Sequence, residues 1–190
     1  RASQLLGDIF NDLEMKEPYR SFGFLALQIL IDAEKKAHRE NPSLIKLAHS
    51  HHHHHREGDD GVHQEDAFLH EAQDMLIDVT GAAMGLRLLN AKVEACLIAP
   101  VSLGDGHVVF SHGNIAVPAP ATANIVKDHG LACVMGPVNT ELCTPTGAAI
   151  LAALKAKLVN NHYSGLISIG TSRGSKSLPI PPLKLFTNNC

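Results

Sequence analysis

Apolar residues recur at helical spacing through residues 1–89 of the chain. In the segment 19–39 they form one stripe that would face a core, and Pro18 stands just before it, where proline suits the start of a helix. The segment 63–89 lacks proline and repeats a similar spacing. We therefore expect three helices, over Gln4 to Met15, Tyr19 to Arg39 and His63 to Leu89.

The period changes after residue 89, where short apolar runs alternate with two further helical segments. This order predicts an α+β fold, with a helical N-terminal part followed by a mixed sheet with helices. We expect one domain over residues 1–190. A division into two lobes stays open, with a helical lobe at 1–89 that contains a histidine-rich loop at 41–64, and a mixed lobe at 90–190. The predicted strands are Lys92 to Pro100, His107 to Ser111, Leu131 to Met135 and Tyr163 to Thr171, and the predicted helices are Ala119 to Asp128 and Pro145 to Val159.

Composition narrows the class of protein. A chain of 190 residues, 45% of them hydrophobic, can bury a sizeable core. A net charge of −3 without a basic patch gives no reason to expect nucleic acid as a partner, and no stretch approaches the length of a membrane span. Because the four cysteines show no short paired spacing, we expect mostly buried thiols in a reducing compartment, the cytoplasm. They are Cys96, Cys133, Cys143 and Cys190.

The densest chemical feature is a run of histidines inside the chain. Neutral imidazole is a common protein ligand for nickel, copper and zinc, and most of these rings are unprotonated near pH 7. An affinity tag is the plain alternative, but tags usually sit at a terminus, and ordinary sequence flanks this run on both sides. The run therefore predicts a surface that collects metal. Its members are His49, His51, His52, His53, His54 and His55, and we call them the histidine tract; His38 before it is taken as incidental.

An acidic stripe follows the tract on the third predicted helix. His70, Asp74 and Asp78 fall four residues apart, so a helix would place them on one face, with Glu71 beside them. Oxygen and nitrogen ligands in one row could hold a divalent cation. A hydrated helix face explains the same spacing, although no lysine or arginine from 62 to 86 neutralises these acids. The two interpretations weigh about equally.

Two loops in the second half could carry chemistry. Asp105, His107 and His112 lie among glycines and could bind metal or protons, but a β-hairpin turn is the better interpretation of the spacing. The sequence around Thr144 and Pro145 is typical of a helix start. Thr146 and Gly147 extend this start with a second hydroxyl and a bare first turn, which favours a phosphate or carboxylate site over plain capping.

Several of these motifs together resemble a known family. The motifs are His70-Glu71 with Asp74, Asp78 and Gly81; Gly104-x-Gly106 with His112-Gly113; Val117-Pro118-Ala119-Pro120-Ala121-Thr122; and Glu141-Leu142-x-Thr144-Pro145-Thr146-Gly147-Ala148. They are similar to those of the nickel insertion protein of nickel-pincer-nucleotide biosynthesis, many members of which carry an internal histidine tract. The resemblance covers most of the chain from about residue 49 onward. It does not include the family's N-terminal strand motif or its C-terminal triphosphate-binding domain.

The resemblance implies a cyclometallase that inserts nickel into a pyridinium bis-thiocarboxylate mononucleotide. One carbon–nickel and two sulfur–nickel bonds form, and cytidine triphosphate is consumed, with Mg or Mn expected if a triphosphate-binding partner domain or chain is present. Under this interpretation the tract, His70, Asp74 and Asp78 bind nickel, and Thr144, Thr146 and Gly147 seat the substrate phosphate. Glu71 or His112 would be the general base that removes the ring proton.

Two other functions stay open from the sequence. The chain could be a non-catalytic nickel store or chaperone, in which the tract alone binds metal. A divalent-metal-dependent phosphohydrolase that uses the carboxylate face is a weaker alternative. A homo-oligomer also stays open.

Overall fold

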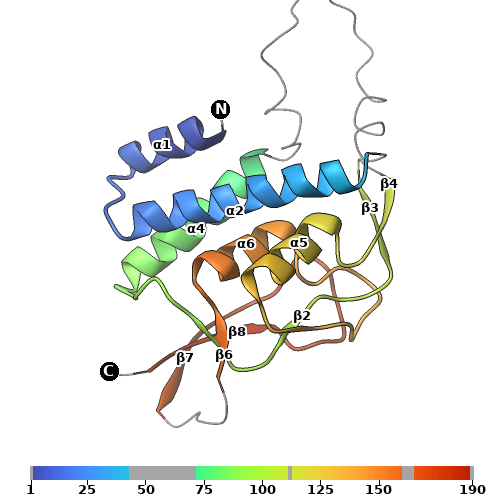
Figure 1. Cartoon of the computed structure of the whole chain (residues 1–190). Helices are drawn as coiled ribbons and strands as arrows, with labels where there is room; N and C mark the ends of the chain where they lie inside the picture. Colours follow the sequence, from blue (N-terminus) through green and yellow to red (C-terminus); the bar gives the residue numbers. More distant parts are fainter. Residues whose placement is uncertain (1, 43–71, 111–112, 160–164, 189–190) are drawn as a thin grey trace, which may run out of the picture. The chain divides into compact units, whose positions relative to one another are not determined.

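The computed structural model of the chain describes residues 2–42, 72–110, 113–159 and 165–188 (Figure 1). The chain divides into two compact units, Arg1–Leu158 and Val159–Cys190. The first unit holds all the described helices and the second holds one pair of strands. The predicted α+β class with helices at the N-terminus is therefore confirmed.

Helix α2 is the centre of the first unit. It contacts α4, α5 and α6 along its length, and Figure 1 shows α5 and α6 side by side beneath it. The predicted helix starts and ends agree with the structure within a few residues, except at the end of α6; the predicted start at His63 of the third helix lies outside the described residues. None of the helices in the described ranges combines the length and apolarity needed to cross a bilayer. The helices are α1 (Ala2–Asp12), α2 (Tyr19–Glu40), α4 (Ala72–Leu88), α5 (Pro120–His129) and α6 (Pro145–Ala153).

The core forms where these helices meet. Full burial of each large apolar side chain contributes about 1.5–3 kcal/mol. Gly23 of α2 lets α1 and α4 approach closely, because a Cβ there would collide with the Phe10 ring and would lie 3.5 Å from Val79 Cγ1. The largest fully buried apolar side chains are Phe10, Phe22, Leu6, Leu27, Leu30, Ile125 and Val79.

The strands of the first unit are short and form three separate pairs. β1 (Cys96–Leu97) pairs in parallel with β6 (Lys157–Leu158), and β2 (Val101–Ser102) pairs in parallel with β5 (Cys133–Val134). β3 (His107–Phe110) and β4 (Gly113–Ala116) form an antiparallel hairpin, so the hairpin interpretation of this loop is confirmed. The strands predicted over 92–100 and 131–135 are wrong in length, since only two residues of each join a ladder.

Helix α6 ends earlier than the apolar pattern predicts. The predicted end at Val159 is wrong because Lys155 adopts a left-handed conformation, with φ 52°, and turns the chain out of the helix. The Ala156 N–H then donates to Leu151 O (3.1 Å), and the following residues become β6. No glycine or proline marks this turn, which is why the sequence pattern missed it.

The second unit is built on an antiparallel pair, β7 (Leu166–Ser172) and β8 (Leu183–Asn188). The predicted strand 163–171 corresponds to β7, whereas β8 was not predicted. A register shift between Ser168 and Gly170 marks a bulge in β7. Arg173 closes the connecting loop, because its guanidinium donates to Leu178 O (2.9 Å) and Ile180 O (2.8 Å). Arg173 therefore has a structural role in this loop.

Candidate functional site

Three of the sequence motifs meet in the loops of the first unit. Backbone hydrogen bonds join Gly104 and Gly136 in both directions (3.2 and 2.8 Å), and the Leu142 N–H donates to Leu103 O (3.1 Å). The Val117 N–H donates to Gly106 O (2.9 Å). The Gly104-x-Gly106 loop thus holds together the segments that lead into α5 and α6.

The two glycines of this loop are required by its geometry. Gly104 has φ 87° and Gly106 has φ 78°, a region that side chains rarely adopt. A Cβ at Gly104 would collide with the carbonyl oxygen of Thr140, and a Cβ at Gly106 would collide with the Asn139 side chain. The glycines therefore permit close contact with the 139–142 segment.

The starts of α5 and α6 lie together. The Thr122 hydroxyl, in the first turn of α5, donates to Cys143 O (3.4 Å), and Cys143 precedes the N-cap residue Thr144 of α6. Thr122 is fully buried, so this bond is shielded from water. Neither helix has an acidic side chain in its first turn. The positive ends of two helix dipoles therefore share one region.

The capping geometry decides which donors remain at the start of α6. Thr144 Oγ1 accepts from the Gly147 N–H (3.2 Å), and Pro145 has no N–H. Thr144 O accepts from the Ala148 N–H (2.9 Å). The Thr146 N–H is the donor that this arrangement leaves, and the Thr146 residue is only 9% exposed. Ordinary helix capping therefore explains the roles of Thr144 and Gly147. Of the three residues predicted to bind an anion, only Thr146 keeps a backbone donor that could do so.

The start of α5 has a different cap. Its N-cap residue Ala119 offers no side-chain hydrogen bond, and Pro120 fills the first helical position. The backbone N–H groups of Ala121 and Thr122 are therefore not capped by the residue that precedes the helix. The segment 117–122 shapes the second helix start of this region.

The thiol of Cys143 lies next to these helix starts but is not reactive at neutral pH. Burial, and then the nearby Glu141 and Cys133, raise the pKa of Cys143 to about 11. The prediction of mostly buried cysteines is correct for Cys143 and wrong for Cys96, which is exposed. Cys133 is intermediate and packs against the core at its edge.

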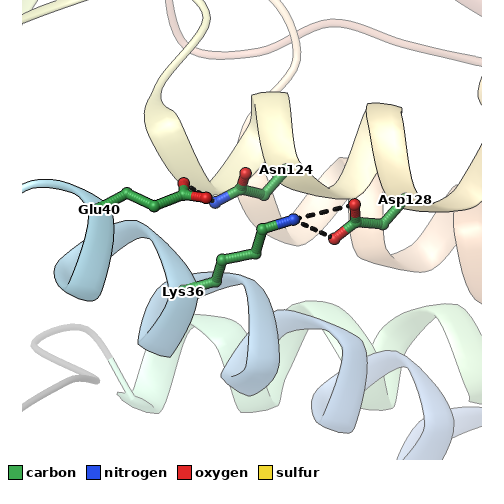
Figure 2. Close-up of polar contacts among 4 residues, drawn as sticks. All are labelled: Lys36, Glu40, Asn124 and Asp128. Carbon is green, nitrogen blue, oxygen red and sulfur yellow. Dashed lines mark hydrogen bonds and ion pairs between the residues drawn. The ribbon is translucent and has the colours of Figure 1, made fainter.

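A pair of polar contacts joins the end of α2 to α5 (Figure 2). Lys36 Nζ lies 2.7 and 2.9 Å from the Asp128 carboxylate oxygens, and the Asn124 amide donates to Glu40 Oε2 (3.1 Å). The hydrogen bond from Lys36 lowers the pKa of Asp128. The two helices are thus antiparallel, and α2 ends near the start of α5. The segment that carries the histidine tract follows directly.

The predicted acidic stripe is described only in its second half. Asp74 and Asp78 are both exposed on α4, one turn apart, while Leu76, Val79 and Ala83 on its other side are buried. In the described ranges, no group of three or more histidine, cysteine, aspartate or glutamate side chains could hold a metal. The described part of the stripe therefore has the geometry of a hydrated helix face.

The remaining predicted ligands and bases lie outside the described residues. These are His70, Glu71, His112 and the histidine tract, His49 and His51, His52, His53, His54 and His55.

Comparison with known proteins decides the family. The sequence model of a family described as nickel insertion protein matches residues 46–187, which is most of the chain. The chain belongs to the nickel insertion protein family. The resemblance inferred from the motifs is thereby confirmed. No solved structure matches the chain.

Relatives in this family come from bacteria and archaea. A pyridinium-3,5-bisthiocarboxylic acid mononucleotide nickel insertion protein of Alkaliphilus metalliredigens is 40% identical over 121 residues, covering 63% of this chain and 28% of the relative. A protein of the same name in Staphylococcus saprophyticus is 37% identical over 123 residues, 64% of this chain and 30% of the relative. A protein of Methanocaldococcus jannaschii, whose name also refers to nickel insertion, is 32% identical over 158 residues, 82% and 35%. The chain thus spans about a third, or less, of these relatives.

Proposed function

We propose that this nickel insertion family member gathers nickel and inserts it into a pyridinium bis-thiocarboxylate mononucleotide, together with a further triphosphate-binding part. Family membership supports the nickel chemistry, and the names of two relatives specify this substrate. The further part is proposed because the chain matches only 28–35% of the length of the three relatives described above.

One observation carries the proposal: the end of α2 and the starts of α5 and α6 occur in the same region of the first unit. Glu40, the last residue of α2, bonds Asn124 near the start of α5, and Thr122 bonds Cys143 just before α6. The chain therefore enters its histidine-bearing segment close to the proposed substrate seat. This proximity supports the proposal that the protein passes nickel to an anionic substrate.

The substrate phosphate is proposed to bind at the paired helix starts. The Thr146 N–H and hydroxyl are the candidate donors, with Thr144 and Gly147 holding the α6 turn in shape, and the buried start of α5 contributes through its helix dipole. Each helix dipole favours a nearby anion by about 0.3–1 kcal/mol. Two helix starts together can therefore orient a dianionic phosphate without a lysine or arginine.

The nickel path uses the residues predicted from the sequence. The tract collects the ion, and His70, Asp74 and Asp78 are proposed to hold it for transfer. During insertion a ring carbon–hydrogen bond breaks, its electron pair forms the carbon–nickel bond, and the proton passes to a base, for which Glu71 and His112 are the candidates. The two thiocarboxylate sulfurs complete the ligation. Cytidine triphosphate, with Mg or Mn, would bind to the proposed triphosphate-binding part.

A nickel store or chaperone is the second candidate function. The exposure of Asp74 and Asp78, without a described cluster of three ligands, favours it. In that case all tight nickel binding would reside in the tract, and the helix starts would not need to recognise a nucleotide.

A nickel titration separates the two candidates. We would compare the intact chain with a variant in which all six tract histidines are serine, using calorimetry in a weakly coordinating buffer. A surviving tight site, with stoichiometry near one, supports transfer to a substrate. Loss of all tight nickel binding in the serine variant would mean that the tract is the only nickel site, which supports a store or chaperone.

A second measurement addresses the substrate seat. Thr146→Val removes one hydroxyl at nearly constant volume, and we expect it to weaken mononucleotide binding about tenfold, since a hydrogen bond to a charged group contributes about 1.5–3 kcal/mol. Thr171→Val, on an exposed position of β7, is the matched control. Equal affinity of the two variants would remove Thr146 from the proposed seat.

The setting of the reaction is also a proposal. Cys96, Cys133 and Cys143 are free thiols, which supports a reducing compartment such as the cytoplasm. Light scattering of the nickel-loaded chain would show whether it acts as a homo-oligomer.

A further inference from the structure

Helix α4 carries large apolar residues on the side that points away from the helices it packs against. Its inner side packs on α2, α1 and α6, and its buried residues there are Leu76, Val79 and Ala83. Ile77 is 68% exposed and Leu88 is 78% exposed. A separation of eleven residues places these two on one side of the helix, opposite the buried residues. A helix that is apolar on both sides is typical of a helix that is covered on both sides.

Two glycines lie on the same side of α4, between these apolar residues. Gly81 and Gly85 follow Ile77 at intervals of four residues, so the three share one helix face. A Cβ built at either glycine would meet no described atom within 4 Å outside the helix backbone. Glycine inside a helix is destabilising relative to alanine, and nothing in the described part of the unit requires it here. We call the surface formed by Ile77, Gly81, Gly85 and Leu88 the outer α4 face.

The outer α4 face is nearly symmetrical about position 83. Gly81 and Gly85 lie two residues to either side of this position, and Ile77 and Leu89 lie six residues to either side. Leu89, directly after the helix end, is 57% exposed. If two copies pack antiparallel, the glycines of one copy meet those of the other, and Ile77 meets Leu88 and Leu89 of the second copy. A two-fold symmetric contact needs a self-complementary surface of this kind.

The charges at the two ends of α4 also favour an antiparallel pair. Asp74 and Asp78 are exposed near the helix start. At the other end, Arg87 in the last turn and the exposed Lys92 outnumber Glu94, whose carboxylate lies 4.0 Å from the Lys92 ammonium. Because Asp74 and Lys92 lie nine residues to either side of position 83, antiparallel copies bring opposite charges together. Parallel copies would bring like charges together.

We propose that the outer α4 face is a contact between two copies of this chain, packed antiparallel about a two-fold axis near position 83. The proposal goes beyond the proposed function and does not depend on the metal. A single helix pair buries less than the standard interface of about 1,600 Å², so we expect a weak dimer with a Kd of about 1–100 μM. Asp74 and Asp78 lie at the rim of the contact, so the dimer leaves them accessible for the nickel path.

Sedimentation equilibrium of the full chain tests the association. The concentration is varied from about 1 μM to about 500 μM, with a chelator present so that metal cannot bridge two histidine tracts. Gly81→Leu places a side chain at the centre of the contact and should raise the Kd about tenfold or more, although leucine favours the helix of the monomer. Gln28→Leu, at an exposed position of α2, is the matched control and should leave the Kd unchanged.

Truncation of an apolar residue provides a second variant of the same face. Ile77→Ser should also raise the Kd about tenfold, because it removes apolar area from the contact. Leu25→Ser is its control, since Leu25 on α2 is 44% exposed and lies outside the outer α4 face. Both substituted residues of the outer α4 face are exposed, so the variants are expected to fold, and circular dichroism verifies this.

Charge reversal tests the direction of the two helices. In an antiparallel pair, Asp74→Lys or Lys92→Asp brings like charges together at both ends, and each should raise the Kd about tenfold at low salt. The chain that carries both substitutions restores opposite charges and should regain the wild-type Kd. In a parallel pair, either substitution would exchange one like-charge contact for another and change little.

Three outcomes would overturn the proposal. A chain that stays monomeric at about 500 μM lacks the contact. A dimer that Gly81→Leu and Ile77→Ser both leave intact uses another surface, and Leu183→Ser would then show whether the exposed Leu183 of β8 forms it. A double charge reversal that does not regain the wild-type Kd contradicts the antiparallel arrangement.

Discussion

Replacing Glu34 with glutamine is expected to stabilise the metal-free protein above pH 7 and to change little near pH 4. Glutamine keeps the size of the side chain but cannot ionise. In the wild type, burial raises the pKa of the carboxyl from 4.5 to about 7. The folded state therefore holds its proton more tightly than the unfolded chain does.

The sign and size of the effect follow from this difference. A raised folded-state pKa contributes stability that is fully present below pH 4.5 and is lost as the pH rises toward about 7. Each pKa unit corresponds to about 1.4 kcal/mol, so the full shift corresponds to about 3 kcal/mol. Because Glu34 is not completely buried, we expect about 2 kcal/mol of stabilisation by Glu34→Gln at pH 8.

Urea unfolding at pH 4, 5.5, 7 and 8, with a chelator present, measures this prediction. The free energy of unfolding of the wild type should fall relative to that of Glu34→Gln across this range, and Asp32→Asn should follow the wild type. Parallel curves for wild type and Glu34→Gln would refute the interior position of the carboxyl.

Other variants test the helix starts and the loop that supports them. Thr144→Ala removes the cap of α6 and should lower the free energy of unfolding by about 1 kcal/mol, measured in urea. Gly104→Ala should cost about 2 kcal/mol or more, because the residue has φ 87° and a Cβ would meet Thr140 O. Lys36→Met should raise the pKa of Asp128 in a carboxyl NMR titration, since the Lys36 hydrogen bond lowers it.

Each of these expectations has an outcome that contradicts it. An unchanged urea midpoint in Thr144→Ala would mean that the cap does not hold the α6 turn, with Thr171→Val as control. Wild-type stability of Gly104→Ala would show that the loop relaxes away from Thr140. An Asp128 pKa that is the same in Lys36→Met and in the wild type would show that the ion pair does not form in solution.

The sequence by itself determined the features that depend on neighbours along the chain. Helical periodicity gave α2 almost to the residue, and the Thr144-Pro145 pair gave the start of α6, because capping is a local property of the backbone. The motifs around Gly104 and Thr144 also indicated the family. The sequence pattern missed the turn at Lys155, because no glycine or proline marks it. It also missed the true length of the two-residue strands, because these form only by pairing with residues far away in the chain.

Tertiary structure alone decided which of these features meet. No spacing shows that Thr122 would bond Cys143 and so bring two helix starts together. The sequence also pointed to Asp74 and Asp78 as metal ligands, and the fold leaves both exposed, while it buries His38 and partly buries Glu34. Burial sets the electrostatic cost of a charge, and burial depends on which helices pack together. The chemistry of those two side chains therefore became visible only in the folded chain.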